Sequence, residues 1–180
     1  MEVEREMRRE FRRNVHLTIL ILLLASLLAG CATPIAAQRP EDLAARKLRI
    51  VATTGMVADA VRNVAGERAE VTALMGPGVD PHLYKASEGD VLRLGTADVV
   101  FYSGLHLEAK LGEVLERMGD RVRARAVTDG MDRSRLSKPA AFEGQYDPHV
   151  WFDVALLAQT IDVIRDTLIE MDPGSAELYR

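Results

Sequence analysis

The sequence predicts an α/β domain with a mainly parallel four-stranded sheet flanked by helices. Three observations lead to this class. Four short apolar or alternating runs are typical of β-strands, helical patterns lie between them, and glycines end those patterns at Gly66, Gly95 and Gly119. Strands that alternate with helices form βαβ units, whose strands run parallel.

The first part of the domain is predicted to hold two strands and two helices. Leu48–Thr53 is apolar and β-branched, and Ala69–Met75 alternates between apolar and polar residues, so both are predicted strands. Met56–Val64 between them is a predicted helix. A second helix is predicted at Asp90–Leu94, where the preceding run Ser87-Glu88-Gly89-Asp90 resembles a capping box.

The second part repeats this alternation. Asp98–Tyr102 is almost wholly apolar, as in a strand covered on both faces, and a helix is predicted at Glu108–Met118. Arg121–Val127 alternates strictly and predicts a half-exposed edge strand. Asp153 is a predicted N-cap for a last helix at Val154–Met171. That helix should bury one apolar stripe, formed by Leu157, Ile161, Ile164, Leu168 and Met171.

The amino-terminal 30 residues have the pattern of a signal peptide. Residues 1–13 carry five Arg and four Glu, residues 14–30 carry no charge, and nine of the twelve residues in Leu17–Leu28 are Leu or Ile. This apolar centre is shorter than the roughly 20 residues of a membrane span and fits the about 7–15 of a signal peptide.

The apolar run ends in Leu28-Ala29-Gly30-Cys31, which resembles a bacterial lipobox. We therefore expect Cys31 to be lipidated and to hold the mature chain to a membrane by its acyl chains. The alternative is an ordinary signal peptide cleaved near Ala36-Ala37, with an unmodified cysteine. Residues 31–47 then form the lipidated cysteine and a tether, which contains Pro34 and Pro40.

The remaining boundaries follow from the predicted elements. Residues 48–171 form one lobe, and Asp172-Pro173 has the form of an N-cap and first residue of another helix. Because the printed sequence ends seven residues after this proline, residues 172–180 are predicted to be the start of a truncated helix.

Composition excludes several function classes. A net charge of −4 and 5% aromatic residues argue against a nucleic-acid-binding protein. The single cysteine excludes an internal disulfide framework and a cysteine-rich zinc site. The sequence also has no H-E-x-x-H motif, no P-loop and no G-x-S-x-G motif.

Two copies of one tripeptide are the strongest functional signal. Asp80-Pro81-His82 follows the second predicted strand, and Asp147-Pro148-His149 precedes the last helix. Loops at the carboxyl ends of parallel strands are where such sheets bind ligands. A neutral imidazole binds Zn²⁺ and related ions, the proline restricts the backbone, and the aspartate can accept a hydrogen bond from the ring or from local amides. The alternative is two turn histidines with no ligand.

Other polar and aromatic residues near these loops have simpler interpretations. His106 is either a third ligand or a surface residue, and we favour the surface. The carboxylate of Glu108 is expected to interact favourably with the positive, amino-terminal end of the following helix. Trp151 and Phe152 are expected to pack as core in the wall of the site.

Three stretches taken in order resemble the TroA-like family, the solute-binding lipoproteins of bacterial manganese and zinc ABC importers. They are Gly76–Tyr84, Tyr102–Glu108 and Asp147–Asp153, and Ile50–Thr54 and Ala97–Val100 fit as well. The resemblance covers residues 48–180, and the lipobox agrees with it independently.

The resemblance implies two α/β lobes joined by a long helix, with the ion buried between them. This chain corresponds to the amino-terminal lobe, whose two ligands carry over to His82 and His149. The other lobe's His or Glu and Asp have no counterpart in this sequence. Zinc-type members often carry a His-rich loop where Met131–Tyr146 has no histidine, which favours manganese slightly over zinc.

The expected function is therefore capture of Mn²⁺ or Zn²⁺ outside the cytoplasm, without catalysis. The implied partners are an ABC permease and its ATPase, with the membrane reached through the lipid anchor. A surface adhesin or scaffold lipoprotein is the main alternative, because a lipid anchor serves either role. A periplasmic metallohydrolase is a weaker one, since it needs an open coordination position and a nearby base.

Overall fold

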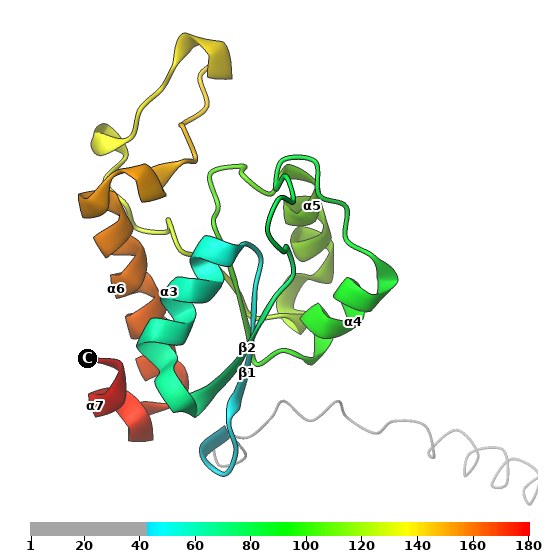
Figure 1. The fold of residues 1–180 in the computed structure, drawn as a ribbon, viewed down its shortest axis with the longest axis vertical. Coiled ribbons are helices and arrows are strands. Elements are labelled where there is room, and N and C mark those ends of the chain that lie inside the picture. The colour runs from blue at the N-terminus through cyan, green and yellow to red at the C-terminus, as the bar shows by residue number, and fades with distance from the viewer. Residues whose placement is uncertain (1–42) are drawn as a thin grey trace, which may run out of the picture. The chain divides into compact units, whose positions relative to one another are not determined.

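The computed structural model describes residues 43–180, apart from the side chains of Glu116 and Asp120 (Figure 1). The predicted signal peptide, Cys31 and most of the predicted tether lie outside the described residues. Within residues 43–180, no helix combines the length and the apolar character that crossing a membrane requires.

The sheet has four strands, all parallel, as the alternation of strands and helices predicts. They are β1 (Leu48–Ala52), β2 (Ala69–Ala73), β3 (Val99–Tyr102) and β4 (Ala124–Ala126), in the order β2-β1-β3-β4. The predicted edge position of the fourth strand is confirmed. It is shorter than predicted: Arg121 ends a 3₁₀ turn, η3 (Gly119–Arg121), Val122 is the C-cap of that turn, and β4 begins at Ala124.

Helices cover both faces of the sheet (Figure 1). α3 (Gly55–Ala65) and α6 (Val154–Met171) lie on one face, and α4 (Glu88–Thr96) and α5 (Ala109–Met118) lie on the other. The short α7 (Ala176–Tyr179) packs beside α3 and α6. The bounds of α6 are those predicted from the sequence.

Alternating strand side chains divide the core into two layers. Ile50 and Phe101 pack with α3 and α6, whereas Val51 and Val100 pack with α4 and α5, and all four are at most 5% exposed. This arrangement follows from the period of two in a strand, which sends successive side chains to opposite faces.

Side chains cap three of the helices. Thr54 accepts a hydrogen bond from the amide of Val57 at the start of α3, and Asp153 accepts from two amides at the start of α6. The predicted capping box of α4 is confirmed, with Ser87 and Asp90 each accepting from the other's backbone amide.

The predicted buried stripe of α6 is correct only in its second half. Ile164, Leu168 and Met171 are buried, but Leu157 and Ile161 are only half-buried. Leu156 and Thr160 take the buried positions instead. At the start of α6, Leu156 packs in a small loop cluster with Met131, Leu136 and Val150, so a different face is buried there.

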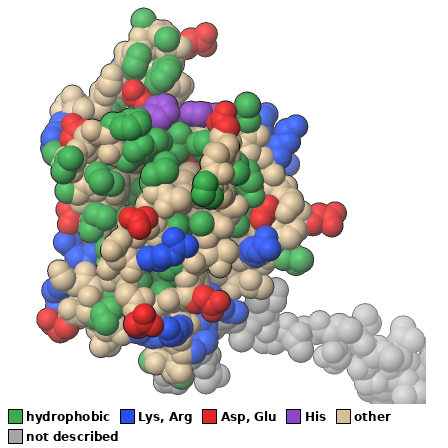
Figure 2. Space-filling view, viewed as in Figure 1, with side chains coloured by type: hydrophobic (Ala, Val, Ile, Leu, Met, Phe, Trp, Pro, Cys, Tyr) green, Lys and Arg blue, Asp and Glu red, His purple; other side chains and the backbone are tan. Residues whose placement is uncertain are grey.

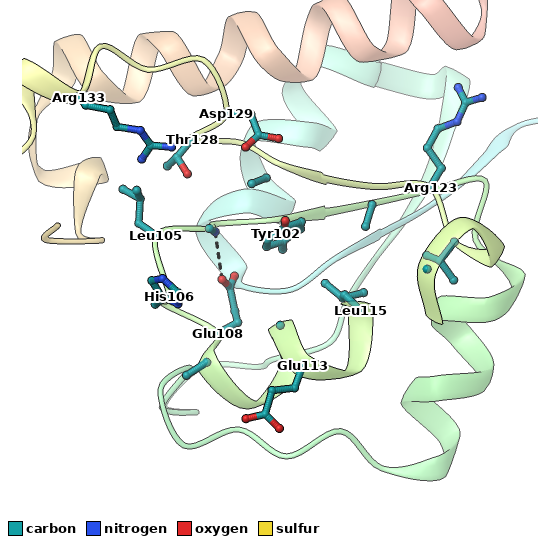
Figure 3. A pocket seen from close by; sticks show the side chains of 17 residues that line it. Tyr102, Leu105, His106, Glu108, Glu113, Leu115, Arg123, Thr128, Asp129 and Arg133 are labelled. Carbon is teal, nitrogen blue, oxygen red and sulfur yellow. Dashed lines mark hydrogen bonds between the residues drawn. The ribbon is translucent and has the colours of Figure 1, made fainter. Parts of the chain in front are cut away.

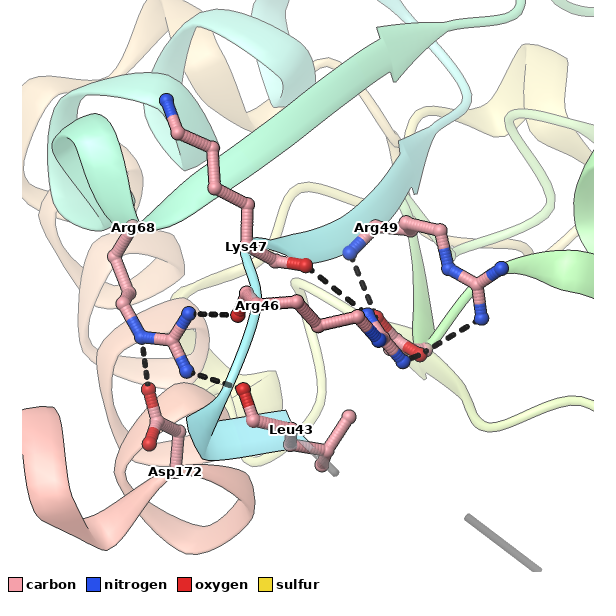
Figure 4. Close-up of polar contacts among 7 residues, drawn as sticks. Leu43, Arg46, Lys47, Arg49, Arg68 and Asp172 are labelled. Atoms are coloured by element: carbon pink, nitrogen blue, oxygen red, sulfur yellow. Dashed lines mark hydrogen bonds and ion pairs between the residues drawn. The ribbon is translucent and has the colours of Figure 1, made fainter. Parts of the chain in front are cut away.

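An arginine joins the two ends of the described chain below the sheet (Figure 4). The guanidinium of Arg68 donates to Asp172 at 2.8 Å, to the carbonyl of Leu43 and to the carbonyl of Arg46. Tyr179 donates to the same carboxylate at 2.8 Å. Asp172 and Pro173 are the N-cap and first residue of a 3₁₀ turn, η7 (Pro173–Ser175), as the sequence predicted, but the side chain of Asp172 binds Arg68 and caps no amide of that turn.

Candidate metal centre

Loops from separate parts of the chain meet at the carboxyl ends of the strands. The segment after β2 carries His82, and His149 immediately precedes a 3₁₀ turn, η6 (Val150–Phe152). In Figure 2 the histidine side chains gather at the upper edge of the molecule, bordered by hydrophobic side chains. The structure thus brings together the two copies of the tripeptide found in the sequence.

The imidazoles of His82 and His149 lie close enough to share one ion. Their ring centroids are 5.5 Å apart, and their planes meet at 60°. An ion bonded to one nitrogen of each ring at about 2.1 Å lies roughly 3.2 Å from each centroid. Two such rings can therefore stand up to roughly 6.4 Å apart on a common ion.

The aspartate of each tripeptide holds the backbone of its histidine. Asp80 Oδ1 accepts from the amide of His82 at 2.9 Å, and Asp147 Oδ1 accepts from the amide of His149 at 3.0 Å. The two loops therefore form the same local turn, in which an aspartate side chain bonds the amide two residues later.

Asp147 also orients the ring of its histidine. Its Oδ1 lies 2.6 Å from His149 Nδ1, a contact that Asp80 does not make among the described hydrogen bonds. The backbone hydrogen bond from His149 is the main cause that lowers the pKa of Asp147, so this carboxyl is ionised near neutral pH. An ionised carboxylate only accepts hydrogen bonds, so Nδ1 carries the proton and Nε2 keeps its lone pair for a ligand.

Neighbouring side chains fix both loops further. The rings of Trp151 and His149 form a T-shaped pair with a centroid distance of 5.2 Å. On the other loop, Tyr84 donates to Asp90 Oδ2 at 2.8 Å and so ties the segment after His82 to the start of α4. Burial, followed by the hydrogen bond to Asp90, raises the pKa of Tyr84 to about 12.

The expectations for the nearby residues have mixed outcomes. His106 is exposed, as predicted for a surface residue. Trp151 is half-buried against His149, but the prediction that Phe152 packs as core is wrong because it is 81% exposed. The single turn of η6 buries Val150 and directs Phe152 into solvent.

The prediction for Glu108 missed its main role. Its side chain is 2% exposed and accepts hydrogen bonds from Thr53 Oγ1 at 2.6 Å and from the amides of Ser103 and Gly104 at 2.7 and 3.2 Å. One signal for this burial was present in the sequence: Glu108 lies three and seven residues before Leu111 and Leu115, on the apolar face of the helix.

One cavity of the described residues lies apart from the two tripeptides. It has a volume of about 910 Å³ and lies beside α5 and β4, where Glu113, Arg123 and Arg133 line it (Figure 3). His106 borders this cavity, but His82 and His149 do not. Within residues 43–180, no three His, Cys, Asp or Glu side chains gather in a way that could hold a metal ion.

The sequence model of one protein family matches most of the chain. It is described as "ZnuA: Zinc-uptake complex component A periplasmic" and matches residues 50–180. This chain belongs to the ZnuA family. The fold class predicted from the sequence is confirmed, and the ZnuA-family membership agrees with the resemblance stated above.

Curated ZnuA-family relatives include metal-binding lipoproteins. The manganese-binding lipoprotein MntA of Bacillus subtilis is 42% identical over 153 residues, which are 85% of this chain and 48% of the relative. The zinc-binding protein TroA of Treponema pallidum is 46% identical over 131 residues, covering 72% of this chain and 42% of TroA. The chain spans about half the length of the curated relatives it matches.

Solved structures agree with this assignment. The periplasmic zinc-binding protein TroA of Treponema pallidum aligns with a TM-score of 0.70 and 42% identity, over 74% of this chain and 47% of that one. The Zn(II)-bound ZnuA-like domain of Streptococcus pneumoniae AdcA aligns with a TM-score of 0.65 and 29% identity, over 74% and 48%. A coverage near one half is expected if this chain corresponds to one lobe of a two-lobe protein.

Proposed function

We propose that this chain captures a manganese or zinc ion for an ABC importer, with His82 and His149 as nitrogen ligands. One observation carries the proposal: two identical tripeptides from separate loops form the same turn and bring their imidazoles to a centroid distance of 5.5 Å. Relatives named for manganese or zinc binding support the choice of ion. The ion is the cargo of this protein, which binds it without catalysing a reaction.

The two histidines supply half of a typical coordination sphere. Zinc usually takes about four ligands in proteins, so we propose that the remaining ligands come from outside residues 43–180. Exposed apolar side chains flank both histidines along the chain, with Leu83 at 73% exposed and Val154 at 80%. Such an apolar rim is typical of a surface that another protein unit covers.

The histidine ligands are tested by calorimetric titration of Mn²⁺ and Zn²⁺ into the full chain. The variants are His82→Ala, His149→Ala and the double variant. His106→Ala is the matched control, since His106 is an exposed histidine on a neighbouring loop. We expect the double variant to lose binding and the control to retain it. Equal binding by the double variant and the unmodified chain would exclude this site.

The pH dependence of binding gives an independent check of the same ligands. A neutral imidazole binds the ion, and protons compete for the same nitrogen as the pH falls. Metal affinity should therefore decrease as the pH is lowered from about 8 to about 5. An affinity that does not change across this range would argue for carboxylate ligands alone.

We further propose that Cys31 is lipidated and anchors the chain on the extracytoplasmic side of the membrane, where it meets a permease and its ATPase. The lipobox-like run before Cys31 and relatives named as lipoproteins support this proposal. The Cys31→Ser variant should lose fatty-acid labelling and move from the membrane fraction to the soluble fraction. A labelled or membrane-bound variant would contradict the anchor.

A further inference from the structure

A buried carboxylate accepts hydrogen bonds at the carboxyl ends of β1 and β3, the two central strands, which lie beside the strands from which the histidine loops start. We propose that Glu108 is a positioning residue for the two-histidine site, because it holds Thr53 and Ser103, through which it is connected to the loops carrying His82 and His149. The inference rests on the proposed function, because its first test measures metal binding by the two-histidine site. Glu108 is not itself proposed as a metal ligand, since its carboxylate oxygens accept three hydrogen bonds from protein groups.

The first connection runs from Glu108 through Thr53 to the loop of His82. Thr53 follows β1, and its hydroxyl donates to Glu108 Oε1 at 2.6 Å. The carbonyl of Thr53 accepts from the amide of Met75 at 3.0 Å, and its own amide donates to Phe101 at 3.0 Å. Met75 directly precedes the loop that carries His82. A displacement of Thr53 therefore moves the root of this loop.

The second connection runs through Ser103 toward His149. The amide of Ser103 donates to Glu108 Oε1 at 2.7 Å. Ser103 lines a small cavity of about 20 Å³ together with Val150 and Trp151. Trp151 in turn meets the ring of His149. The cavity is large enough for about one water molecule. Because the two residues share the wall of so small a cavity, a displacement of Ser103 alters the space into which Trp151 packs.

Glu108 also stabilises an unusual backbone conformation. Gly104, Leu105 and His106 have φ values of 84°, 51° and 64°, in the left-handed region that non-glycine residues rarely adopt. A Cβ at Gly104 would lie 2.5 Å from Thr128 Oγ1, so the turn is also confined from the other side. Strained backbone persists where its surroundings hold it firmly, and it is concentrated at binding sites. The carboxylate of Glu108 restrains this turn through the hydrogen bonds that it accepts from the amides of Ser103 and Gly104.

The chain offers a matched control at the opposite end of the sheet. The side chain of Asp98 is 1% exposed and precedes β3, at the amino end of the strands. Its carboxylate is paired with Arg46 at 2.7 Å, and it accepts from the amide of Arg49 at 2.7 Å. Asp98→Asn therefore neutralises an equally buried carboxylate whose side chain, among the described hydrogen bonds, contacts neither histidine loop.

The test compares Glu108→Gln with Asp98→Asn in the full chain. Glutamine keeps the shape of the side chain, but one of its oxygens becomes an N–H₂ group that faces a donor. We expect Glu108→Gln to weaken Zn²⁺ binding by about 10–100-fold, the range for residues that orient metal ligands. It should also change the absorption spectrum of bound Co²⁺, which reports ligand geometry. Asp98→Asn should leave both unchanged.

Two results would overturn the inference. One is a folded Glu108→Gln variant with the unmodified Zn²⁺ affinity and Co²⁺ spectrum. The other applies if Glu108→Gln does not fold: Thr53→Val then removes one hydrogen bond at constant shape, and unchanged affinity in that folded variant refutes the positioning role. A weaker Zn²⁺ affinity in Thr53→Val supports it.

A second readout separates this inference from the proposed function. In the metal-free protein, the imidazole NMR signals of His82 and His149 should shift or broaden in Glu108→Gln and stay unchanged in Asp98→Asn. If the unmodified chain binds no Zn²⁺, the proposed function fails, and these signals still decide whether Glu108 positions the rings. If the chain binds Zn²⁺ but the signals respond equally in both variants, only the inference fails.

Discussion

Replacing Asp147 with alanine removes two hydrogen bonds from the His149 loop. One comes from the backbone amide of His149 at 3.0 Å, and the other joins Asp147 Oδ1 to the ring atom Nδ1 at 2.6 Å. Asp80→Ala removes only the equivalent backbone contact, from the amide of His82 at 2.9 Å. The difference between these two variants therefore isolates the contribution of the ring contact.

The size of that difference follows from the geometry. A hydrogen bond to a charged group is worth about 1.5–3 kcal/mol. The side chains of His149 and Asp147 are 32% and 33% exposed, so solvent screens this contact in part. We therefore reduce the value to about 1–2 kcal/mol. Since 1.4 kcal/mol is tenfold in affinity, Asp147→Ala should weaken Zn²⁺ binding by about 5–30-fold more than Asp80→Ala.

The assay is a competition between the protein and a chromophoric chelator for Zn²⁺ at constant pH. NMR of the metal-free protein provides the second measurement, since Asp147→Ala should convert His149 from a single Nδ1-protonated form to a mixture of tautomers. Equal losses of affinity in the two variants would refute the reasoning. So would a larger loss in Asp80→Ala, because that residue makes no ring contact among the described hydrogen bonds.

Three further predictions concern stability. Arg68→Ala leaves the carboxylate of Asp172 buried without its cation, so the free energy of unfolding in urea should fall by about 3–5 kcal/mol; a loss under about 1 kcal/mol contradicts this. Burial alone would raise the pKa of Asp98 and Asp172, but the hydrogen bonds they accept outweigh it and lower both pKa values. The two carboxylates therefore contribute fully to the free energy of unfolding above the pKa of an unfolded aspartate, about 3.9, and this contribution is lost as the pH falls below that value. Urea unfolding between about pH 5 and pH 3 measures the loss, and a rise in stability over this range contradicts the prediction. Ser103 Oγ is buried without a hydrogen-bond partner in the described part of the chain, so Ser103→Ala should be neutral or stabilise by up to about 1 kcal/mol, and a clear loss would reveal a partner there.

The sequence was most informative where the deciding signals are local. The bounds of α6 were predicted correctly because Asp153 caps it and its helical pattern is long. The buried face at its start was predicted wrongly, since that face depends on a loop cluster that includes Met131 and Val150. Periodicity cannot specify which distant loop covers a helix.

The same distinction holds at the candidate site. His82 and His149 were singled out because each stands in the same tripeptide, and the turn that the tripeptide forms is local. The role of Glu108 was missed because one donor, Thr53, lies 55 residues away in the sequence. The exposure of Phe152 was missed for a similar reason, as a single 3₁₀ turn sets its direction.

The two ends of the sheet compensate their buried carboxylates in different ways. At the amino end, Asp172 and Asp98 are each paired with an arginine. At the carboxyl end, the buried Glu108 takes part in none of the ion pairs found within residues 43–180, and hydrogen-bond donors satisfy it instead. Dipoles that satisfy a carboxylate leave its negative charge in place, whereas a paired cation cancels it. The carboxylate of Glu108 therefore keeps its negative charge beside the carboxyl ends of the strands, and such a charge favours a bound cation over an anion.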